Sequence, residues 1–275
     1  MATWLITGCS TGLGRALAEA VIDAGHNVVA TARDRTRVAN LTEGNDRVLA
    51  LALDVTVPEQ VTAAVAEAEA TFGGVDVLIN NAGYGYRAAV EEGDELDIRK
   101  LFDTHFFGSV AMIKAVLPGM RARRSGAIVN LSSIGATLTP VGSGYYAAAK
   151  AAIEGMTGSL HGELAPLGIS ATVIEPGIFA TDFAGRSLMQ STTVIDDYAG
   201  TAGKRRKGTV VNAPAKGDPA RAAQAIIAAV QADNPPAFLL LGSDAFETYR
   251  QILQDRLDST SRWETVSRST DYDAR

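Results

Sequence analysis

Cysteine and histidine are scarce in this sequence. Cys9 is its one cysteine, so no disulfide can form within the chain, and this usage favours a reducing, cytoplasmic location. The three histidines, His26, His105 and His161, are far apart and show none of the spacings of a zinc site. We therefore predict no metal site.

Long apolar runs are also missing. The longest, Val48–Leu53 and Ala225–Val230, have six residues each, whereas a membrane-spanning helix needs about 20. The N-terminus has neither the basic start nor the apolar stretch of a signal peptide. The net charge of -6 argues against nucleic acid as the main partner, and the basic run at residues 204–207 is expected to be a solvated loop. We predict neither a membrane nor a nucleic acid as partner.

Hydrophobic residues make up 47% of the 275 positions and charged residues 20%, a balance that excludes disorder and suits one domain over residues 1–275. Short β-branched runs alternate with longer stretches of helical periodicity. Strands that are apolar throughout are buried on both faces, as in a parallel sheet covered by helices. The sequence therefore predicts an α/β fold, a Rossmann-like doubly wound parallel sheet of about seven strands with helices on both faces.

The strands that we expect are short and the helices between them are long. The expected strands are Thr3–Thr7, Asn27–Thr31, Val48–Leu53, Asp76–Asn80, Ala127–Leu131, Ile169–Glu175 and Phe238–Leu241. The expected helices are Leu13–Ala24, Pro58–Phe72, Glu95–Arg123, Tyr146–Leu167 and Pro219–Ala232.

A glycine-rich segment follows the first expected strand and leads into the first helix. Its glycines, Gly8, Gly12 and Gly14, are spaced G-x-x-x-G-x-G, which differs from the common dinucleotide pattern G-x-G-x-x-G. Glycine permits a tight turn and a close approach of the main chain, and the N–H groups at a helix start attract a pyrophosphate. Sheets of this kind bind ligands at the carboxyl ends of their strands, where this segment lies.

With Thr7 before it, this segment resembles the glycine loop of the short-chain dehydrogenase/reductase family. Further family motifs occur in the same order: Asp54-Val55, Asn80-Asn81-Ala82-Gly83, Ser133 with Tyr146-x-x-x-Lys150, and Pro176-Gly177 with Thr181. The resemblance runs from about residue 3 to residue 181 and weakly to residue 241. It implies a nicotinamide dinucleotide cofactor bound by Gly8, Ser10, Thr11, Gly12, Leu13, Gly14, Arg33, Asp54, Val55, Asn81, Ala82, Gly83, Tyr146, Lys150, Pro176, Gly177, Ile178 and Thr181.

Tyr146 and Lys150 share one face of a helix because they are four residues apart. An ammonium favours the phenolate, so we expect Lys150 to lower the pKa of Tyr146 toward the working pH. Ser133, at a strand end, can stabilise charge on a carbonyl oxygen. The resemblance implies the same roles, with Lys150 also holding the nicotinamide ribose. Tyr145 has no lysine four residues on, and Ser132, one residue off the family spacing, is expected to face away or to support the loop.

The end of the second expected strand bears on the choice of cofactor. Ala32 stands where family members specific for NAD carry Asp, and the guanidinium of Arg33 suits a 2′-phosphate. The resemblance thus implies NADP(H), with NAD(H) less favoured. Asp34 leaves an alternative open, because its carboxylate could reach the ribose; we favour its role as the N-cap of the next helix.

His105 stands where the family usually has the Asn of an Asn-x-x-Gly pattern. We give equal weight to two interpretations. In the first, His105 is catalytic and takes part in proton relay to Lys150, which predicts an inflection of activity at mildly acidic pH. In the second, it is a packing residue of the core.

The segment from about residue 184 to residue 218 resembles the substrate lid of the family, and residues 243–275 are a C-terminal extension. Phe179, Phe183, Leu188 and Met189 could line an apolar pocket or belong to the core. Helix-like periodicity continues over Asp244–Leu257, and the residues from Asp258 to Arg275 are polar. We expect this tail as a whole to cover the sheet edge or to fray. The resemblance also implies a homodimer or homotetramer that pairs the helices over residues 95–123 and 146–167.

These observations predict an NADP(H)-dependent oxidoreductase that interconverts a ketone or aldehyde and an alcohol, with Tyr146 as proton donor and acceptor. The substrate is a small molecule with substantial apolar surface, as for a carbonyl reductase or alcohol dehydrogenase. The alternative is a dinucleotide-sensing regulator, although such a protein need not retain Ser133, Tyr146 and Lys150. A sugar-nucleotide epimerase typically needs a larger C-terminal region than follows Pro176.

Overall fold

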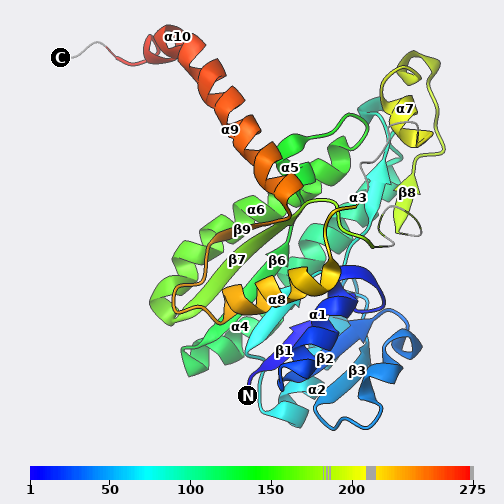
Figure 1. The fold of residues 1–275 in the computed structure, drawn as a ribbon, viewed down its shortest axis with the longest axis vertical. Helices are drawn as coiled ribbons and strands as arrows, with labels where there is room; N and C mark the ends of the chain where they lie inside the picture. Colours follow the sequence, from blue (N-terminus) through cyan, green and yellow to red (C-terminus); the bar gives the residue numbers. More distant parts are fainter. Residues whose placement is uncertain (182, 184, 186, 209–214, 273–275) are drawn as a thin grey trace.

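A computed structural model describes residues 1–181, 183, 185, 187–208 and 215–272. Its centre is a parallel sheet of seven strands in the order β3-β2-β1-β4-β6-β7-β9 (Figure 1). The order reverses between β1 and β4, the switch point at which such sheets bind ligands. The predicted fold class and all seven strands are confirmed. Their bounds are β1 (Thr3–Ile6), β2 (Asn27–Ala32), β3 (Val48–Ala52), β4 (Val77–Asn80), β6 (Gly126–Leu131), β7 (Ile169–Pro176) and β9 (Phe238–Leu241).

Helices cover both faces of this sheet (Figure 1). Leu17 and Ile226 belong to the apolar cluster under α1 and α8, whereas Met112 belongs to the cluster under α2, α4 and α6. Neighbouring residues of a strand point to opposite faces, so Ile6 joins the first cluster and Leu5 the second. This explains why the strands are apolar throughout. The helix bounds are α1 (Gly12–Asp23), α2 (Pro58–Phe72), α4 (Gly108–Arg123), α6 (Gly144–Leu164) and α8 (Pro219–Val230), with short 3-10 turns η1 (Arg35–Arg37), η2 (Ala39–Thr42) and η5 (Ala165–Leu167).

The single helix expected over residues 95–123 is interrupted. It consists of α3 (Glu95–Phe102), a π-helical turn η4 (Asp103–Phe107) and α4. In the π turn the N–H of Gly108 bonds to the carbonyl oxygen of Asp103, five residues earlier. A Cβ on Gly108 would lie 2.6 Å from Cγ2 of Val55, so the helix approaches β3's end closely there. Such turns occur frequently at functional sites, and this one contains the buried His105.

The C-terminal extension is a helix that leaves the body of the molecule. It comprises α9 (Ser243–Arg262) and α10 (Glu264–Arg268), and so continues past Leu257. Ala245 is buried and the ring of Tyr249 lies 5.2 Å from that of Phe238 on the edge strand. From Leu253 to residue 272 every residue is exposed, and the helix projects away from the sheet (Figure 1). The start of α9 therefore covers the sheet edge as expected, whereas the described residues from Leu253 on are largely helical and do not cover it.

Two short strands that the sequence did not indicate lie beyond the carboxyl edge of the main sheet. β5 (Gly85–Arg87) pairs in parallel with β8 (Leu188–Gln190), and η3 (Val90–Glu92), η7 (Asp196–Tyr198) and α7 (Ala202–Arg206) follow them. The prediction of a solvated loop at residues 204–207 is wrong, because residues 204–206 belong to α7 and Arg206 is largely buried. Its side chain is 13% exposed and forms an ion pair with Glu92, 114 positions away in the sequence. Among the described residues, no helix is long and apolar enough to cross a membrane.

Candidate active site

The glycine loop turns sharply from β1 into α1. Gly8 and Gly12 have φ values of +74° and +65°, in the left-handed region that glycine adopts without strain. Within the described chain, the side chain of Thr11 at the N-cap of α1 makes no capping hydrogen bond, so the first N–H groups of the helix stay available. Ser10, Thr11 and Leu13 are half-buried along this turn. The loop therefore has the features of an anion-binding helix start.

Asn81 holds the glycine loop against β4. Its Nδ2 donates hydrogen bonds to the main-chain oxygens of Thr7 (2.8 Å) and Gly8 (3.0 Å). In return, Oγ1 of Thr7 accepts from the N–H groups of Asn81 and Ala82, both at 3.0 Å. A Cβ on Gly14 would overlap Nδ2 of Asn81, so glycine is required there for the contact. The resemblance implied a cofactor contact for Asn81, and the structure shows its amide bonded to the loop.

The segment after β7 reaches the same loop. A Cβ on Gly12 would lie 3.6 Å from Cβ of Thr181, so the two segments are neighbours. Pro176 ends β7, and the N–H of Gly177 donates to the carbonyl oxygen of Leu241 at 2.9 Å. The N–H of Ile178 donates to Oδ2 of Asp244 at 2.7 Å, at the start of α9. The structure thus brings the first and the last of the sequence motifs together.

The two acidic residues at the ends of β2 and β3 cap the turns that follow them. Oδ1 of Asp34 accepts from the N–H of Thr36 (3.0 Å) and from its hydroxyl (2.7 Å). Asp34 is therefore the N-cap of η1, the alternative that we favoured. Asp54 makes the same pair of contacts with Thr56. Arg33 is exposed beside Asp34, and Val55 is buried against Gly108.

Ser133, Tyr146 and Lys150 lie together at the carboxyl edge of the sheet. Ser133 follows β6 and caps α5 (Ile134–Leu138), with its Oγ accepting from the N–H of Gly135 at 3.0 Å. The Ser133 and Tyr146 side chains are neighbours, because a Cβ on Gly135 would lie 3.2 Å from Oγ of Ser133 and 3.4 Å from Cε1 of Tyr146. Nζ of Lys150 lies 5.9 Å from the Tyr146 ring centroid and donates to the carbonyl oxygen of Leu131 at 2.6 Å. Tyr145 instead donates its hydroxyl to the carbonyl oxygen of Val90, which separates the two neighbouring tyrosines.

Burial decides the protonation of the tyrosine. It raises the pKa of Tyr146 to about 12, while the Ser133 hydroxyl lowers it by less. This direction is opposite to the one expected from Lys150, because desolvation disfavours the phenolate. Burial also lowers the pKa of Lys150 to about 8, against the opposing influence of Glu154. Near neutral pH the tyrosine is a phenol that carries its proton.

His105 faces Tyr146 from the π turn. Its ring centroid lies 5.7 Å from those of Tyr146 and Tyr84, edge-on to the former. Nε2 lies 2.8 Å from the carbonyl oxygen and 3.1 Å from the nitrogen of Tyr84, whereas Nδ1 has no partner among the described residues. Burial, then the charge of Lys150, lower the pKa of His105 well below its ordinary value, so the ring is neutral at mildly acidic pH. If His105 takes part in proton relay, we therefore expect the inflection of activity at a more acidic pH than the sequence indicated.

The four apolar candidates for a substrate pocket lie in different places. Phe183 is 39% exposed and its ring lies 5.8 Å from that of Tyr146. Leu188 packs at Gly85 in the small sheet, and Met189 beside it is 42% exposed. Phe179 packs against the core cluster under α1 and α8. Phe183 is thus beside Tyr146, and Phe179 packs against the core.

Comparison with known proteins identifies the family. The model of the short chain dehydrogenase family matches residues 2–191. The chain belongs to the short-chain dehydrogenase family. Oxidoreductase BOA17 of Botryotinia fuckeliana is 39% identical over 96% of this chain and 97% of its own. A short-chain dehydrogenase structure from Streptomyces avermitilis superposes with a TM-score of 0.91 and 40% identity, covering 98% of this chain and 100% of the other.

Short-chain dehydrogenases bind a nicotinamide dinucleotide, and similar structures contain both forms. A 3-ketoacyl-(acyl-carrier-protein) reductase from Brucella melitensis is complexed with NADH (26% identity, TM-score 0.73, covering 87% of this chain and 95% of the other). A short chain dehydrogenase from Burkholderia cenocepacia is in complex with NADP (26% identity, TM-score 0.72, covering 95% and 96%). The open helix start, the glycine turn and the nearby Thr181 fit the pyrophosphate of such a cofactor.

In this dehydrogenase a pair of carboxylic acids lies behind Lys150, which the motifs did not indicate. Ser132 contacts the carbonyl oxygen of Lys150 at 3.4 Å and donates a short hydrogen bond to Oε1 of Glu154, so it supports the loop as expected. Glu175 is buried, accepts from the hydroxyl of Thr137 at 3.2 Å, and has no partner for Oε2 among the described residues. Burial and then Glu154 raise the pKa of Glu175 to about 9. The available signal was a charged residue inside a strand expected to be buried on both faces.

Proposed function

We propose that this dehydrogenase reduces ketones or aldehydes to alcohols with NADPH, with Tyr146 as the proton donor. The observation that carries the proposal is that Ser133, Tyr146 and Lys150 lie together, at the strand ends where the glycine loop also lies. A bound reduced nicotinamide supplies the hydride that goes to the carbonyl carbon. The chain supplies the proton, the orientation and the charge.

Tyr146 protonates the carbonyl oxygen as this carbon is reduced. Its raised pKa keeps the proton on the phenol at neutral pH, which is the required state for the reducing direction. Ser133 hydrogen-bonds the same oxygen and stabilises the charge that develops on it. The Lys150 ammonium then favours the tyrosinate that remains after the transfer. Neutral His105, with Nδ1 facing no partner in the described chain, is the group that we assign to a bridging water in proton resupply.

The NADP preference rests on the end of β2. Asp34 uses its carboxylate to cap η1, which leaves Ala32 and the exposed Arg33 to meet the ribose. A guanidinium pairs well with a 2′-phosphate, and no carboxylate of this strand end opposes it.

The substrate that we propose is a ketone with substantial apolar surface. Phe183 beside Tyr146 and the exposed Met189 and Val194 offer apolar contacts along the segment after β7. We further propose residues 184–218 as a substrate lid, of which residues 184, 186 and 209–214 lie outside the described residues. A cytoplasmic homodimer or homotetramer paired through α4 and α6 completes the proposal, with residues 1–275 as one domain.

A panel of carbonyl compounds with both cofactors tests this function. Acetophenone, 2-octanone, cyclohexanone and ethyl acetoacetate are each assayed with NADPH and with NADH, following the absorbance of the reduced cofactor. Turnover with NADPH exceeding that with NADH is the expected result. Tight NADPH binding without turnover of any compound would contradict the proposal and favour the dinucleotide-sensing alternative.

A further inference from the structure

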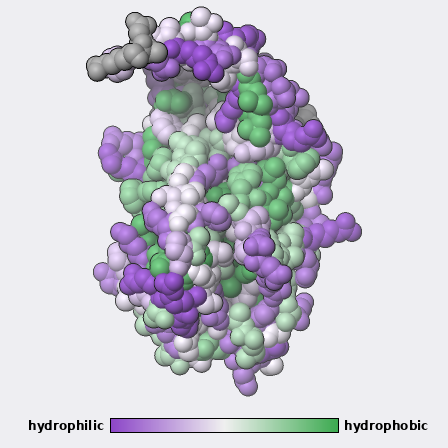
Figure 2. Space-filling view, turned by 90° about the vertical axis from the view of Figure 1, so that its left-hand side faces the viewer, coloured by the Kyte–Doolittle hydropathy of each residue, from purple (hydrophilic) through white to green (hydrophobic). Residues whose placement is uncertain are grey.

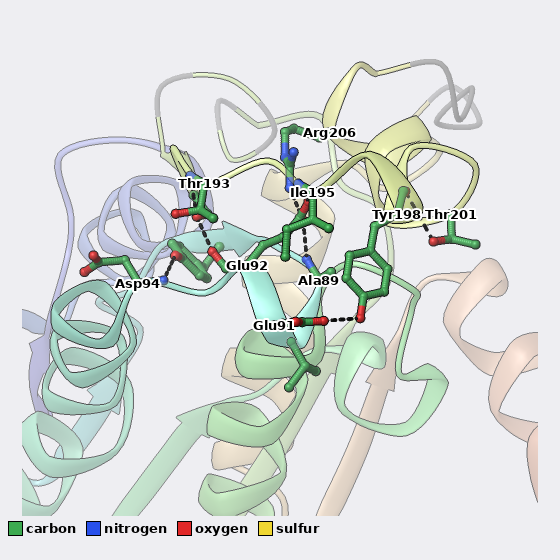
Figure 3. A network of polar contacts seen from close by, with 12 residues as sticks. Ala89, Glu91, Glu92, Asp94, Thr193, Ile195, Tyr198, Thr201 and Arg206 are labelled. Carbon is green, nitrogen blue, oxygen red and sulfur yellow. Dashed lines mark hydrogen bonds and ion pairs between the residues drawn. The ribbon is translucent and has the colours of Figure 1, made fainter.

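Glu92 is a buried carboxylate that no sequence motif indicated. It ends η3, and its side chain is 1% exposed. Oε1 accepts from the N–H of Ile195 at 2.9 Å, and Oε2 accepts from the N–H of Ala89 at 3.0 Å and from Arg206 in a short ion pair (Figure 3). Its main-chain oxygen accepts from the hydroxyl of Ser191. One residue therefore contacts three points of the segment between residues 191 and 206.

These contacts keep Glu92 ionised despite its burial. Burial raises the pKa of Glu92, but the N–H groups of Ile195 and Ala89 and the Arg206 guanidinium together hold it below the ordinary value. A buried charge is tolerated only when it is paired and hydrogen-bonded, as this one is. The neighbouring Glu91 carboxylate is engaged separately, by the hydroxyl of Tyr198 at 2.7 Å.

The segment that Glu92 holds is also fixed at its two ends. We call residues 188–206 the lid segment. At its start, β8 pairs with β5, and at its end Nη1 of Arg87 donates to the carbonyl oxygen of Arg205 at 2.9 Å. Ala202 of α7 is buried, and a Cβ on Gly142 would lie 3.2 Å from its Cα. The lid segment is thus packed onto the turn that leads into the catalytic helix α6.

The elements that carry the lid segment also border the catalytic residues. Tyr84, next to β5, bonds to His105, whose ring faces Tyr146. Ala88, just after β5, forms an isolated bridge with Ser143 at the start of α6. A displacement of the lid segment would therefore alter the space in front of Tyr146.

We propose that Glu92 is a positioning residue of the substrate site, which holds the lid segment in place and thereby sets the affinity for the carbonyl substrate. The proposal rests on the proposed function, because it treats residues 188–206 as the substrate's cover. Glu92 does not touch the reacting atoms, since its side chain is used by Ala89, Ile195 and Arg206. Its effect on the reaction is on binding rather than on proton transfer.

Glu92→Gln tests this with little change of shape. The substitution removes the negative charge that pairs with Arg206. It also replaces one acceptor oxygen by an NH₂ group, which cannot accept a hydrogen bond from the N–H of Ala89 or of Ile195. A lid segment that is ordered only part of the time binds substrate more weakly in proportion to the lost fraction. We expect KM for the fastest ketone of the panel to rise about 10-fold or more, and kcat to stay within about threefold.

Two readouts decide the matter, and one needs no substrate. Hydrogen exchange followed by mass spectrometry measures whether residues 188–206 exchange faster in Glu92→Gln, with Glu95→Gln as control because Glu95 pairs with Arg99 on the surface. Faster exchange confined to this segment, a raised KM and an NADPH Kd within about twofold are expected. Unchanged exchange, or faster exchange with an unchanged KM, overturns the proposal.

Variants of the partner keep the test decisive if Glu92→Gln does not fold. Arg206→Met removes the cation and should reproduce the effects on exchange and KM, whereas Arg206→Lys keeps the charge and should restore part of both. Equal effects of Met and Lys would contradict the ion pair as the cause. If the wild-type protein reduces no ketone of the panel, the proposed function fails, and hydrogen exchange alone decides whether Glu92 holds the lid segment.

Discussion

The candidate site has two sides that are held together differently. On the side of the glycine loop, the hydrogen bonds are made to main-chain oxygens, and they need glycine at position 14 because a side chain there would overlap Asn81. Around Glu92, on the side of the lid segment, they join charged side chains to the main chain of a distant part of the sequence. The first arrangement leaves a spacing of glycines in the sequence. The second leaves only ordinary charged residues, which surfaces also contain, so it becomes visible only in the folded chain.

This comparison assigns separate tasks to the two sides. The glycine-loop side is expected to set the affinity for the cofactor, and the lid side the affinity for the carbonyl substrate. Variants on one side should therefore leave the binding constant of the other ligand unchanged. A variant that altered both constants equally would break the comparison.

Gly14→Ala should have the largest effect on the glycine-loop side. Its Cβ would overlap Nδ2 of Asn81 and approach the carbonyl oxygen of Gly8, so the loop must shift. Such overpacking costs about 1–3 kcal/mol, and we expect a loss of cofactor affinity of about 5–150-fold. Fluorescence titration with NADPH and NADH measures it. Gly162→Ala, a position with nothing within 4 Å of the added methyl, is the control. Equal Kd values for the two variants would refute the fit of this loop to the cofactor.

Arg33→Ala tests whether the glycine-loop side of the site distinguishes NADPH from NADH. Losing one charge-assisted contact should weaken the binding of NADPH by about 1.5–3 kcal/mol, or about 10–150-fold in Kd, and leave the Kd for NADH unchanged. Titration of both cofactors against wild type and variant gives the ratio. An unchanged NADPH to NADH preference would mean that Arg33 does not meet the 2′-phosphate.

Glu175 and Glu92 are both buried, but only Glu92 has a cation. The raised pKa of Glu175, about 9, means that the folded protein holds a proton that the unfolded chain releases above about pH 4.3. Its contribution to stability is complete below that pH and declines until pH 9. Glu175→Gln cannot titrate, so its free energy of unfolding should match that of wild type at pH 4.5 and exceed it by more than about 1 kcal/mol at pH 8.

Denaturant unfolding at the two pH values measures this difference, with the exposed Glu95→Gln as the control. Glu92→Gln should instead lower the free energy of unfolding, because it removes one partner of a buried ion pair. A Glu175→Gln protein less stable than wild type at pH 8 would show that Glu175 is ionised in the folded state.

Much of the fold, and the grouping of the candidate site residues at the carboxyl edge of the sheet, could be predicted from the sequence, because both depend on local patterns. The strands are apolar throughout because both faces are covered, and Tyr146 and Lys150 face one site because of helical geometry. Asp34 as a cap also followed from local chemistry. The π turn at His105 was missed, since it depends on the packing of Gly108 against Val55.

The direction of the Tyr146 pKa could not be predicted either. The sequence shows the nearby lysine but not the burial, and burial is the larger cause. The ion pair of Glu92 with Arg206 joins positions 114 residues apart, and no local pattern connects them. In both cases the decisive quantity is the environment that distant segments create.

The central claim is that Tyr146 is the proton donor, and Tyr146→Phe tests it most directly. The substitution removes the hydroxyl and keeps the ring against His105 and Phe183. General acid catalysis contributes about 10²–10⁴-fold, so kcat for the fastest ketone should fall by that factor while the NADPH Kd stays within about twofold. Tyr145→Phe, which loses a hydrogen bond to Val90, should retain activity. Near wild-type turnover in Tyr146→Phe, or an inactive Tyr145→Phe, would contradict this assignment.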